Sequence, residues 1–490
     1  MENISSVELG LIAVSRDCFP IELSKKRREA LVAACNAKAI KVTEIKTVIE
    51  NENDIAAALQ EITDKRVNAL VVFLGNFGPE APETILIQKF DGPAMIIAAA
   101  EETGDNLING RGDAYCGMLN ASYNCGLRKL RPYIPEYPVG TPEELTELVA
   151  EFFPIARTML SLASLKVFSF GPRPQDFFAC NAPIKPLYDM GIEIMENSEL
   201  DLLELFNAME GSPEVEKIAK EMAGELKDGN TYPDMLMRLA QYEATLLKFM
   251  ADHLGTRKYG VFANKCWPAF EGAFKFVPCY INSRLAAKGI PVACEVDIYG
   301  AISEYIATCV TMKPATILDI NNTVPHDLMA EHPEIAYKNS DLFMGFHCGN
   351  TAACHLVKPE MKYQLIMHRL MEPDKAPNIT RGTLEGQIRP GEVTLFRLQS
   401  TAGCELKSYI AQGEVLPVPP KSFGGIGIFG IPEMGRFYRH VLIEKRFPHH
   451  GAVAFEHAGK SLFAIMKLLG VPDVSYNQPA AQKYPTENPF

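Results

Sequence analysis

Short apolar runs alternate with amphipathic helical segments along the first hundred residues, and this alternation is the strongest constraint on the fold. The expected strands are 7–14, 40–45, 69–74 and 94–100, and the expected helices are 21–37 and 53–65. Runs that are apolar throughout are typical of strands buried on both faces, and intervening helices favour parallel pairing. The sequence therefore predicts a parallel-sheet α/β domain at the N-terminus.

The pattern changes twice along the 490 residues, which is a length that suggests two or three domains. A proline-rich stretch at 126–142 interrupts regular structure and is the best linker candidate, and the strand and helix alternation then resumes. Beyond about residue 358, period-two stretches broken by Gly and Pro indicate strands and turns. We expect two Rossmann-like parallel-sheet α/β domains, 1–135 and 136–357, followed by a mostly β C-terminal domain, 358–490.

Composition excludes several classes of partner. The formal net charge is −12, whereas nucleic acids and anionic membranes are bound by concentrated basic faces. No apolar run reaches the roughly 18 residues of a membrane span, and the acidic start lacks the positive end of a signal peptide. The twelve cysteines form no CxxC motif, which favours a reducing compartment. We expect a cytoplasmic protein without nucleic-acid or membrane partners.

Two acidic residues follow apolar runs within residues 288–322. Glu295 closes the run Ile290–Cys294, a helix-period segment comes next, and Asp319 closes the run Ala315–Leu318. We interpret this as a βαβ unit of a parallel sheet, and such sheets bind ligands outside the carboxyl ends of their strands. A helix first-turn carboxylate and a turn-capping residue are the individual alternatives, but the shared placement favours a common site.

Histidines in two further segments are candidates to complete such a site. His347 ends the apolar run 341–347, and the pair His449-His450 lies between a proline and a glycine, before another apolar run. Carboxylates are suited to Mg²⁺ or Mn²⁺, and a neighbouring imidazole favours Mn²⁺ or another transition ion. The alternative for the pair is a partly buried structural role.

Sequence motifs for nucleotide binding, nucleophilic catalysis and zinc proteases do not suggest another function. Gly425, Gly427 and Gly430 spell GxGxxG, but no βαβ unit surrounds them and Pro432 blocks the expected helix. We interpret them as turn glycines. The chain contains no P-loop, GxSxG or HExxH sequence.

Five segments in order, ACEVDIYGA, ILDINN, GFHCGN, GEVTLFRLQS and FPHHGAVAF, resemble the L-fucose isomerase and L-arabinose isomerase superfamily. The resemblance covers most of the chain and is strongest from about Lys258 onward. It implies an intramolecular oxidoreductase, an aldose–ketose isomerase that acts on an open-chain sugar through a metal-stabilised enediolate. It also implies Mn²⁺, with Mg²⁺ or Co²⁺ as substitutes, and a homo-oligomer, commonly a homohexamer, with shared active sites.

The resemblance assigns roles to four residues of this sequence. Glu295 and Asp319 match the two acidic metal ligands and acid/base residues, and His450 matches the histidine ligand. His347 matches a further ligand of the arabinose-type enzymes. Those enzymes carry Glu where this chain has Asp319, so the acids are fucose-like and ligation by His347 stays open.

Four residues are candidates for sugar binding: Arg16, Arg173, Trp267 and His449. The two arginines, together with Lys265, favour an anionic tail, so a sulfonated sugar such as sulfoquinovose is a candidate beside a fucose- or arabinose-like sugar. Surface positions for the arginines and a core position for the tryptophan are the alternatives.

The site is also compatible with a metal-dependent sugar or sugar-phosphate lyase or hydrolase. The first 125 residues alone would suit a non-catalytic sugar-binding protein.

Overall fold

The computed structural model describes residues 1–488, without the side chains of 106 and 109, and the chain forms two compact units. One unit is Ser5–Leu160, and the other joins Met1–Ile4 to Ser161 and the residues that follow. Asn3 fastens the N-terminal piece to this second unit, because its side chain donates to the carbonyls of Gly260 and Gly289 at 2.8 Å each. No described helix is both long and apolar enough to cross a membrane.

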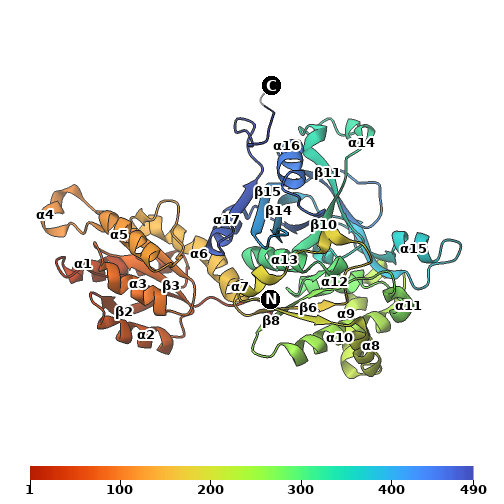
Figure 1. The fold of residues 1–490 in the computed structure, drawn as a ribbon, viewed down its shortest axis with the longest axis horizontal. Coiled ribbons are helices and arrows are strands. Elements are labelled where there is room, and N and C mark those ends of the chain that lie inside the picture. The colour runs from red at the N-terminus through yellow and green to blue at the C-terminus, as the bar shows by residue number, and fades with distance from the viewer. Residues whose placement is uncertain (489–490) are drawn as a thin grey trace. The chain divides into compact units, whose positions relative to one another are not determined.

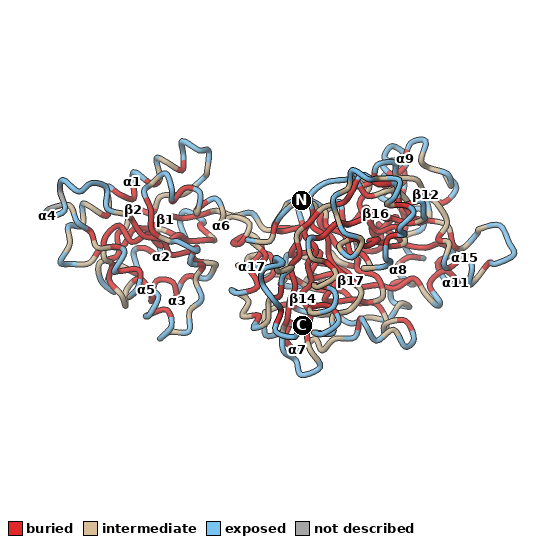
Figure 2. The backbone as a smooth tube through the Cα atoms, turned by 90° about the horizontal axis from the view of Figure 1, so that it is seen from above, coloured by how far each residue is buried: buried red, intermediate tan, exposed pale blue. Residues whose placement is uncertain are grey.

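A parallel sheet with the strand order β2-β1-β3-β4-β5 forms the centre of the first unit (Figure 1). Its strands are β1 (Leu9–Val14), β2 (Thr43–Ile49), β3 (Ala69–Leu74), β4 (Ala94–Ala99) and β5 (Val139–Gly140). Its helices are α1 (Ile21–Ala37), α2 (Asp54–Asp64), α3 (Glu80–Lys89), α4 (Leu107–Gly110), α5 (Ala114–Leu127) and α6 (Pro142–Leu162). β1, β3 and β4 are buried at every position, as their apolar sequences predict; β1 is red in Figure 2.

The proline-rich stretch 126–142 is part of this sheet rather than a linker. It contains β5, which pairs with β4, and the backbone N–H of Tyr133 donates to the Ala94 carbonyl at 2.8 Å. Proline ended the helical pattern as expected, but short extended pieces between the prolines still add to the sheet edge. The predicted domain boundaries at 135 and 357 stay predictions.

A second parallel sheet, in the order β7-β6-β8-β9, opens the larger unit. Its strands are β6 (Leu165–Phe170), β7 (Glu193–Asn197), β8 (Tyr259–Ala263) and β9 (Val292–Ala293). The helices of this region are α7 (Lys185–Asp189), α8 (Glu199–Ala208), α9 (Pro213–Leu226), α10 (Leu236–His253), α11 (Phe270–Phe274) and α12 (Cys279–Ala287). Buried aromatic rings between the strands and α10 form its core, with Phe170 and Phe249 in edge-to-face contact at 4.9 Å.

A mixed, mainly antiparallel sheet of nine strands follows, in the order β12-β13-β16-β11-β10-β17-β14-β15-β18. Its strands are β10 (Thr316–Asn322), β11 (Leu342–His347), β12 (Glu360–Tyr363), β13 (Arg381–Gln387), β14 (Gly391–Ser400), β15 (Leu406–Val415), β16 (Gly425–Gly430), β17 (His450–Ala454) and β18 (Asp473–Tyr476). The helices are α13 (Ile298–Thr311), α14 (His326–Ala330), α15 (Leu365–Met371), α16 (Met434–Phe437) and α17 (Gly459–Leu468). Two parallel-sheet α/β regions followed by a mostly β region confirm the predicted fold class.

The predicted βαβ unit around α13 is wrong. β9 lies in the parallel sheet, whereas β10 lies in the nine-stranded sheet between the antiparallel strands β11 and β17. An apolar run does not specify its partner strands, so the local pattern fitted either sheet. The glycines Gly425, Gly427 and Gly430 are also not turn residues, because they lie in β16. A Cβ on Gly430 would come within 2.7 Å of the Tyr337 ring, which explains the missing side chain there.

Candidate active site

Five acidic and imidazole side chains that are distant in sequence converge in the larger unit. Glu295 lies in the turn between β9 and α13, Asp319 in β10, and His347 at the end of β11. His450 is the first residue of β17, and His449 directly precedes it. These residues, with two neighbours, form three overlapping groups, and within each group the ligand atoms lie within 4.8 Å of one another. His450 belongs to all three groups, so it is the centre of the cluster.

Strand pairing brings Asp319 and His450 together. The two residues are directly opposed across the antiparallel pair β10 and β17, and Ile320 N–H donates to the His449 carbonyl at 2.9 Å. Opposed residues project to the same face of a sheet with Cβ atoms about 5 Å apart. A slip of one residue would send one of them to the other face, so the register of two apolar strands determines this half of the site.

A strained turn places Glu295. Glu295 and Val296 both have left-handed backbone angles, with φ of 60° and 57°, which are unusual for residues other than glycine. The turn is held on one side by the Val296 N–H, which donates to the Asn264 carbonyl at 3.0 Å. On the other side, Asp297 caps α13 by accepting from the Gly300 N–H at 2.9 Å. The carboxylate is therefore positioned by a helix cap and a neighbouring strand end.

Three buried polar atoms in the cluster have no hydrogen-bond partner among the described residues: Glu295 Oε2, Asp319 Oδ1 and His450 Nε2. The His450 nitrogen lies 3.0 Å from the Glu295 oxygen and 3.4 Å from the Asp319 oxygen. Leaving such atoms unpaired costs about 1–3 kcal/mol each. Two carboxylate oxygens and one imidazole nitrogen that face one another are the donor set of a divalent cation, so these residues fit a metal ion.

The group formed by Cys180, Asp297 and His450 is not a comparable metal site. Both oxygens of Asp297 are already engaged: Oδ2 accepts from His450 Nδ1 at 2.8 Å and from Arg397 at 2.5 Å, and Oδ1 accepts from Arg397 at 2.8 Å. Cys180 Sγ lies 3.7 Å from the same His450 Nδ1. The His450 nitrogen that Asp297 does not engage, Nε2, therefore faces Glu295 and Asp319 instead.

His347 is oriented as a hydrogen-bond donor. Its Nδ1 accepts from the backbone N–H of Cys348 at 2.9 Å, so the neutral ring carries its proton on Nε2. Burial lowers the pKa of His347, and that of His449 as well, which keeps both rings neutral. A protonated Nε2 has no lone pair to offer a metal, so this geometry favours Glu295, Asp319 and His450 as the ligand set.

The charges within the cluster support one another. Burial would raise the pKa of Asp319, but the surrounding histidines lower it below its ordinary value. Burial likewise opposes a charge on His450, yet the bond with Asp297 and the two acids raise the pKa of His450 well above its ordinary value. The concentration of negative charge that favours a proton here favours a metal cation equally.

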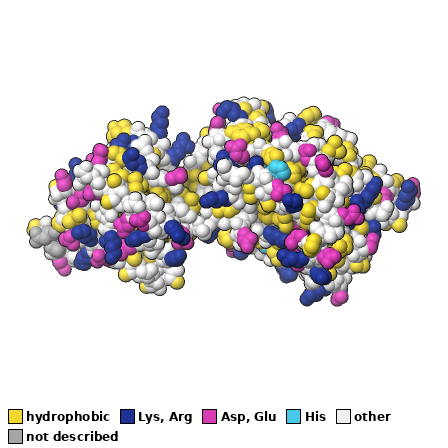
Figure 3. Space-filling view, turned by 90° about the horizontal axis from the view of Figure 1, so that it is seen from below, with side chains coloured by type: hydrophobic (Ala, Val, Ile, Leu, Met, Phe, Trp, Pro, Cys, Tyr) yellow, Lys and Arg dark blue, Asp and Glu magenta, His cyan; other side chains and the backbone are white. Residues whose placement is uncertain are grey.

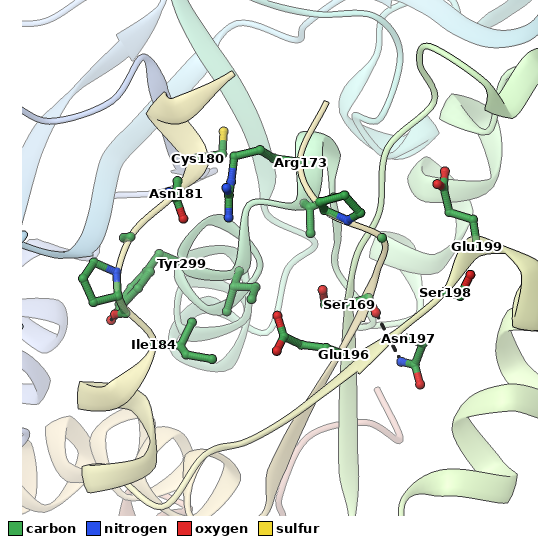
Figure 4. A pocket seen from close by; sticks show the side chains of 16 residues that line it. Ser169, Arg173, Cys180, Asn181, Ile184, Glu196, Asn197, Ser198, Glu199 and Tyr299 are labelled. Atoms are coloured by element: carbon green, nitrogen blue, oxygen red, sulfur yellow. Dashed lines mark hydrogen bonds between the residues drawn. The ribbon is translucent and has the colours of Figure 1, made fainter. Parts of the chain in front are cut away.

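A cavity of about 720 Å³ adjoins the cluster (Figure 4). Its described lining includes Cys180 and Val296 but neither Glu295 nor Asp319, so it lies next to the candidate metal ligands rather than around them. Arg173 and Glu196 direct their charged groups into it (Figure 4). No described residue pairs with the Arg173 guanidinium. A cation without a partner at a cavity wall is suited to an anionic ligand.

Two other predicted binding residues are placed differently. Trp267 is half-buried and reaches the cluster through Phe177, whose ring lies 6.2 Å from the indole and 5.2 Å from the His449 ring. Trp267 is therefore not a fully buried core residue, and its predicted role in sugar binding stays a prediction. Lys265 is already paired, because its Nζ lies 3.2 Å from Glu199 and donates to the Pro172 carbonyl at 2.9 Å.

Arg16 belongs to the unit Ser5–Leu160, at the end of β1. Its guanidinium lies 3.5 Å from Glu80 and over the Phe77 ring at 5.2 Å. Its predicted role in sugar binding stays a prediction.

Comparison with known families decides the class of the protein. Residues 10–163 match the family "Fucose/sulfoquinovose isomerase, N-terminal domain", and residues 345–476 match the family "L-fucose isomerase, C-terminal domain". The second match contains His347, His449 and His450. The chain belongs to the L-fucose isomerase superfamily. The matches confirm the predicted resemblance and the prediction of a sugar isomerase.

Curated members of the superfamily resemble this chain over much of its length. A protein of Alkalicoccus urumqiensis named sulfoquinovose isomerase is 26% identical to this chain, over 68% of this chain and 70% of its own length. A protein of the same name from Clostridium sp. (strain MSTE9) is 28% identical, over 61% of this chain and 62% of its own length. The Priestia aryabhattai protein of that name is 23% identical, over 80% of this chain and 81% of its own length. A solved periplasmic solute-binding protein of an ABC transporter from Actinobacillus succinogenes 130z, with bound D-allose, aligns at a TM-score of 0.16 and 10% identity, covering 62% of this chain and 92% of that one; this score supports no argument.

Two residues of this superfamily member were missed by sequence reasoning. Asp297 and Arg397 form a buried ion pair behind His450. The signals were present in both cases: an Asp directly before the segment IYGAISEY is a typical helix cap, and Arg397 interrupts the apolar strand VTLFRL. A charged residue inside an otherwise apolar strand needs a buried partner.

A buried acid of α13 makes the stability of this superfamily member depend on pH. Burial raises the pKa of Glu304 from its ordinary value of 4.5 to about 8. Between these two values the folded state binds more protons than the unfolded state, so the free energy of unfolding falls as pH rises. The limiting slope is about 1.4 kcal/mol per pH unit. Glu304→Gln should flatten the decline between pH 5 and 8 in urea denaturation, whereas parallel curves for the two proteins would contradict this.

Proposed function

We propose that this chain is a divalent-metal-dependent aldose–ketose isomerase whose substrate is the sulfonated sugar sulfoquinovose. The observation that carries the metal site is the set of buried atoms without hydrogen-bond partners among the described residues, Glu295 Oε2, Asp319 Oδ1 and His450 Nε2. Two carboxylates and one imidazole suit Mn²⁺, with Mg²⁺ or Co²⁺ as substitutes. Membership in a superfamily of sugar isomerases supports the reaction class.

Isomerisation of an aldose moves one carbon-bound proton from C2 to C1 and one hydroxyl proton from O2 to O1. A divalent metal held by Glu295, Asp319 and His450 would supply Lewis-acid polarisation of the carbonyl and would stabilise the negative charge that develops on the sugar oxygens. Glu295 and Asp319 each act as general base and then as general acid, one for the carbon-bound proton and the other for the oxygen-bound proton. His449 Nε2 lies 3.6 Å from Asp319 Oδ1 and 3.9 Å from Glu295 Oε2, within reach of a sugar hydroxyl held between them.

A sulfonated substrate is supported by the relatives and by one arginine at the cavity wall. The curated relatives are named sulfoquinovose isomerase. On the face in Figure 3, Lys and Arg side chains lie among Asp and Glu side chains rather than in one basic area. A sulfonate is therefore expected to be recognised by an individual arginine, and Arg173 is the candidate because it lines the cavity and forms no ion pair with a described residue.

Arg173→Gln should raise KM for sulfoquinovose about tenfold or more, because a charge-assisted hydrogen bond contributes roughly 1.5–3 kcal/mol. KM for L-fucose, a neutral sugar, should change by less than about twofold. The matched control is Arg439→Gln, which removes an exposed arginine paired with Glu444 at 2.7 Å. Equal changes in KM for the two sugars would remove Arg173 from sulfonate recognition. The same comparison with Arg16→Ala tests Arg16.

A sugar panel tests the proposed reaction and substrate together. The Mn²⁺-loaded chain is incubated with sulfoquinovose, L-fucose, L-arabinose and D-arabinose, and ketose formation is followed by NMR. We expect the highest kcat/KM with sulfoquinovose. Conversion of a neutral sugar alone would retain the isomerase and reject the sulfonated substrate. The homohexamer with shared active sites stays a prediction, which the particle mass in solution tests.

A further inference from the structure

We infer that Asp297 and Arg397 are positioning residues that orient His450 and hold its proton on Nδ1. The inference deepens the proposed function and rests on it, because it concerns the imidazole that would bind the metal. Asp297 accepts from His450 Nδ1 at 2.8 Å, and this leaves Nε2 directed at Glu295 and Asp319. A metal-binding histidine whose other nitrogen donates to a carboxylate is held in the tautomer that ligates, and its donor strength rises.

The Asp297 carboxylate is held from several directions. Oδ1 accepts from the Gly300 N–H at 2.9 Å and from Arg397 Nη2 at 2.8 Å, and Oδ2 accepts from Arg397 Nη1 at 2.5 Å. The residue is 1% exposed. Gly300 allows this approach, because a Cβ there would lie 2.6 Å from Asp297 Oδ2. The carboxylate has no freedom to rotate, so it defines the plane and the tilt of the His450 ring.

Arg397 holds the carboxylate from behind. It lies in β14, next to β17, and is 0% exposed. Gln399 Oε1 accepts from its Nε at 3.1 Å and from its Nη2 at 2.7 Å, so the guanidinium is anchored on both sides. Burial opposes the charge on Arg397, but Asp297 raises the pKa of Arg397 above its ordinary value. The pair stays ionised in the interior.

Stability alone does not account for this pair. Removing two charges from water costs several kcal/mol per ion, and apolar side chains of similar volume often give an equal or greater stability. A buried pair that also hydrogen-bonds a histidine of the active site is better explained by the constraint that it imposes on that histidine. Asp297 and Arg397 thus act through His450 and do not touch the sugar.

The test compares Mn²⁺ affinity in the full-length protein, measured by calorimetry and by the Mn²⁺ electron paramagnetic resonance signal, without any need for turnover. In Asp297→Asn, the amide accepts from Arg397 with its oxygen and presents its NH₂ to His450 Nδ1. The ring proton then moves to Nε2, where it blocks ligation. We expect the Kd for Mn²⁺ to rise about 10- to 100-fold. Arg397→Lys keeps one charge but not the fork, so a smaller increase is expected.

The matched control is Glu243→Gln, which breaks another buried ion pair. Glu243 is 0% exposed and accepts from Arg284 at 2.6 Å. This variant should lose stability in urea and retain the wild-type Kd for Mn²⁺. An unchanged Kd in folded Asp297→Asn, or equal losses of affinity in Glu243→Gln, would overturn the positioning role. If Asp297→Asn does not fold, the same criteria apply to Arg397→Lys. Absence of Mn²⁺ binding by the wild-type chain would instead contradict the proposed function itself.

Discussion

Glu295→Gln is expected to lower kcat by at least about 10³-fold while the protein remains folded. The amide cannot accept a proton, and it replaces a charged oxygen, 3.0 Å from His450 Nε2, with a neutral group. Loss of a general base alone costs about 10²–10⁴-fold, and loss of a charged metal ligand adds to it. The measurement is ketose formation at saturating Mn²⁺, with circular dichroism to follow the fold.

The matched control for this substitution is Glu271→Gln. Glu271 is 0% exposed, and burial raises its pKa to about 8, so its carboxyl group is largely neutral at pH 7. It belongs to none of the three groups that could hold a metal ion, and the amide should reproduce its size and charge state. We expect kcat within about threefold of the wild-type value. More than a tenth of wild-type activity in Glu295→Gln would exclude Glu295 as the base.

Asp319 should be equally sensitive, and its two conservative substitutions separate charge from position. Asp319→Asn keeps the size of the side chain opposite His450 but removes the charge; we expect a loss of about 10³-fold in kcat and weaker Mn²⁺ binding. Asp319→Glu keeps the charge and moves the carboxylate by one methylene. We expect this variant to bind Mn²⁺ and still lose about 10²-fold in kcat, because displacement by about 1 Å disrupts the reacting geometry.

Steady-state kinetics and Mn²⁺ titration of both Asp319 variants distinguish the roles. Near-normal kcat in Asp319→Asn with unchanged Mn²⁺ affinity would mean that the residue is structural. Near-normal kcat in Asp319→Glu would mean that the reaction needs the negative charge of this residue but not the exact position of its carboxylate. The second result would also bring the site closer to the arabinose-type enzymes, which carry Glu at this position.

Local sequence patterns were sufficient for elements whose identity depends on their own residues. The predicted helix 21–37 coincides with α1, and the apolar runs 69–74 and 94–100 match β3 and β4 within one residue. Strand partners are a different matter. The run Ala315–Leu318 predicted a strand correctly, but the place of β10 between β11 and β17 depends on pairing with residues 22 to 137 positions later, which no local pattern specifies.

Dependence on distant residues also explains which site residues were predicted and which were missed. Glu295, Asp319 and His450 were predicted from acids that close apolar runs and from a resemblance to known motifs, although Asp319 lies inside its strand rather than at its end. The left-handed turn at Glu295 has no local signal, because it uses neither Gly nor Asn. Arg397 lies 100 residues from Asp297, so only the folded sheet shows that a charge in β14 supports a histidine in β17.

We propose that the cluster of Glu295, Asp319 and His450 binds a divalent metal on which sugar isomerisation depends. The most direct test uses the metal-stripped full chain with sulfoquinovose, with and without one equivalent of Mn²⁺, and follows the ketose by NMR. We expect stoichiometric Mn²⁺ binding, and ketose formation only in the presence of the metal. Ketose formation at the full rate by the stripped protein would contradict it. Mn²⁺ binding without conversion of any sugar would keep the metal site and favour a lyase or hydrolase instead.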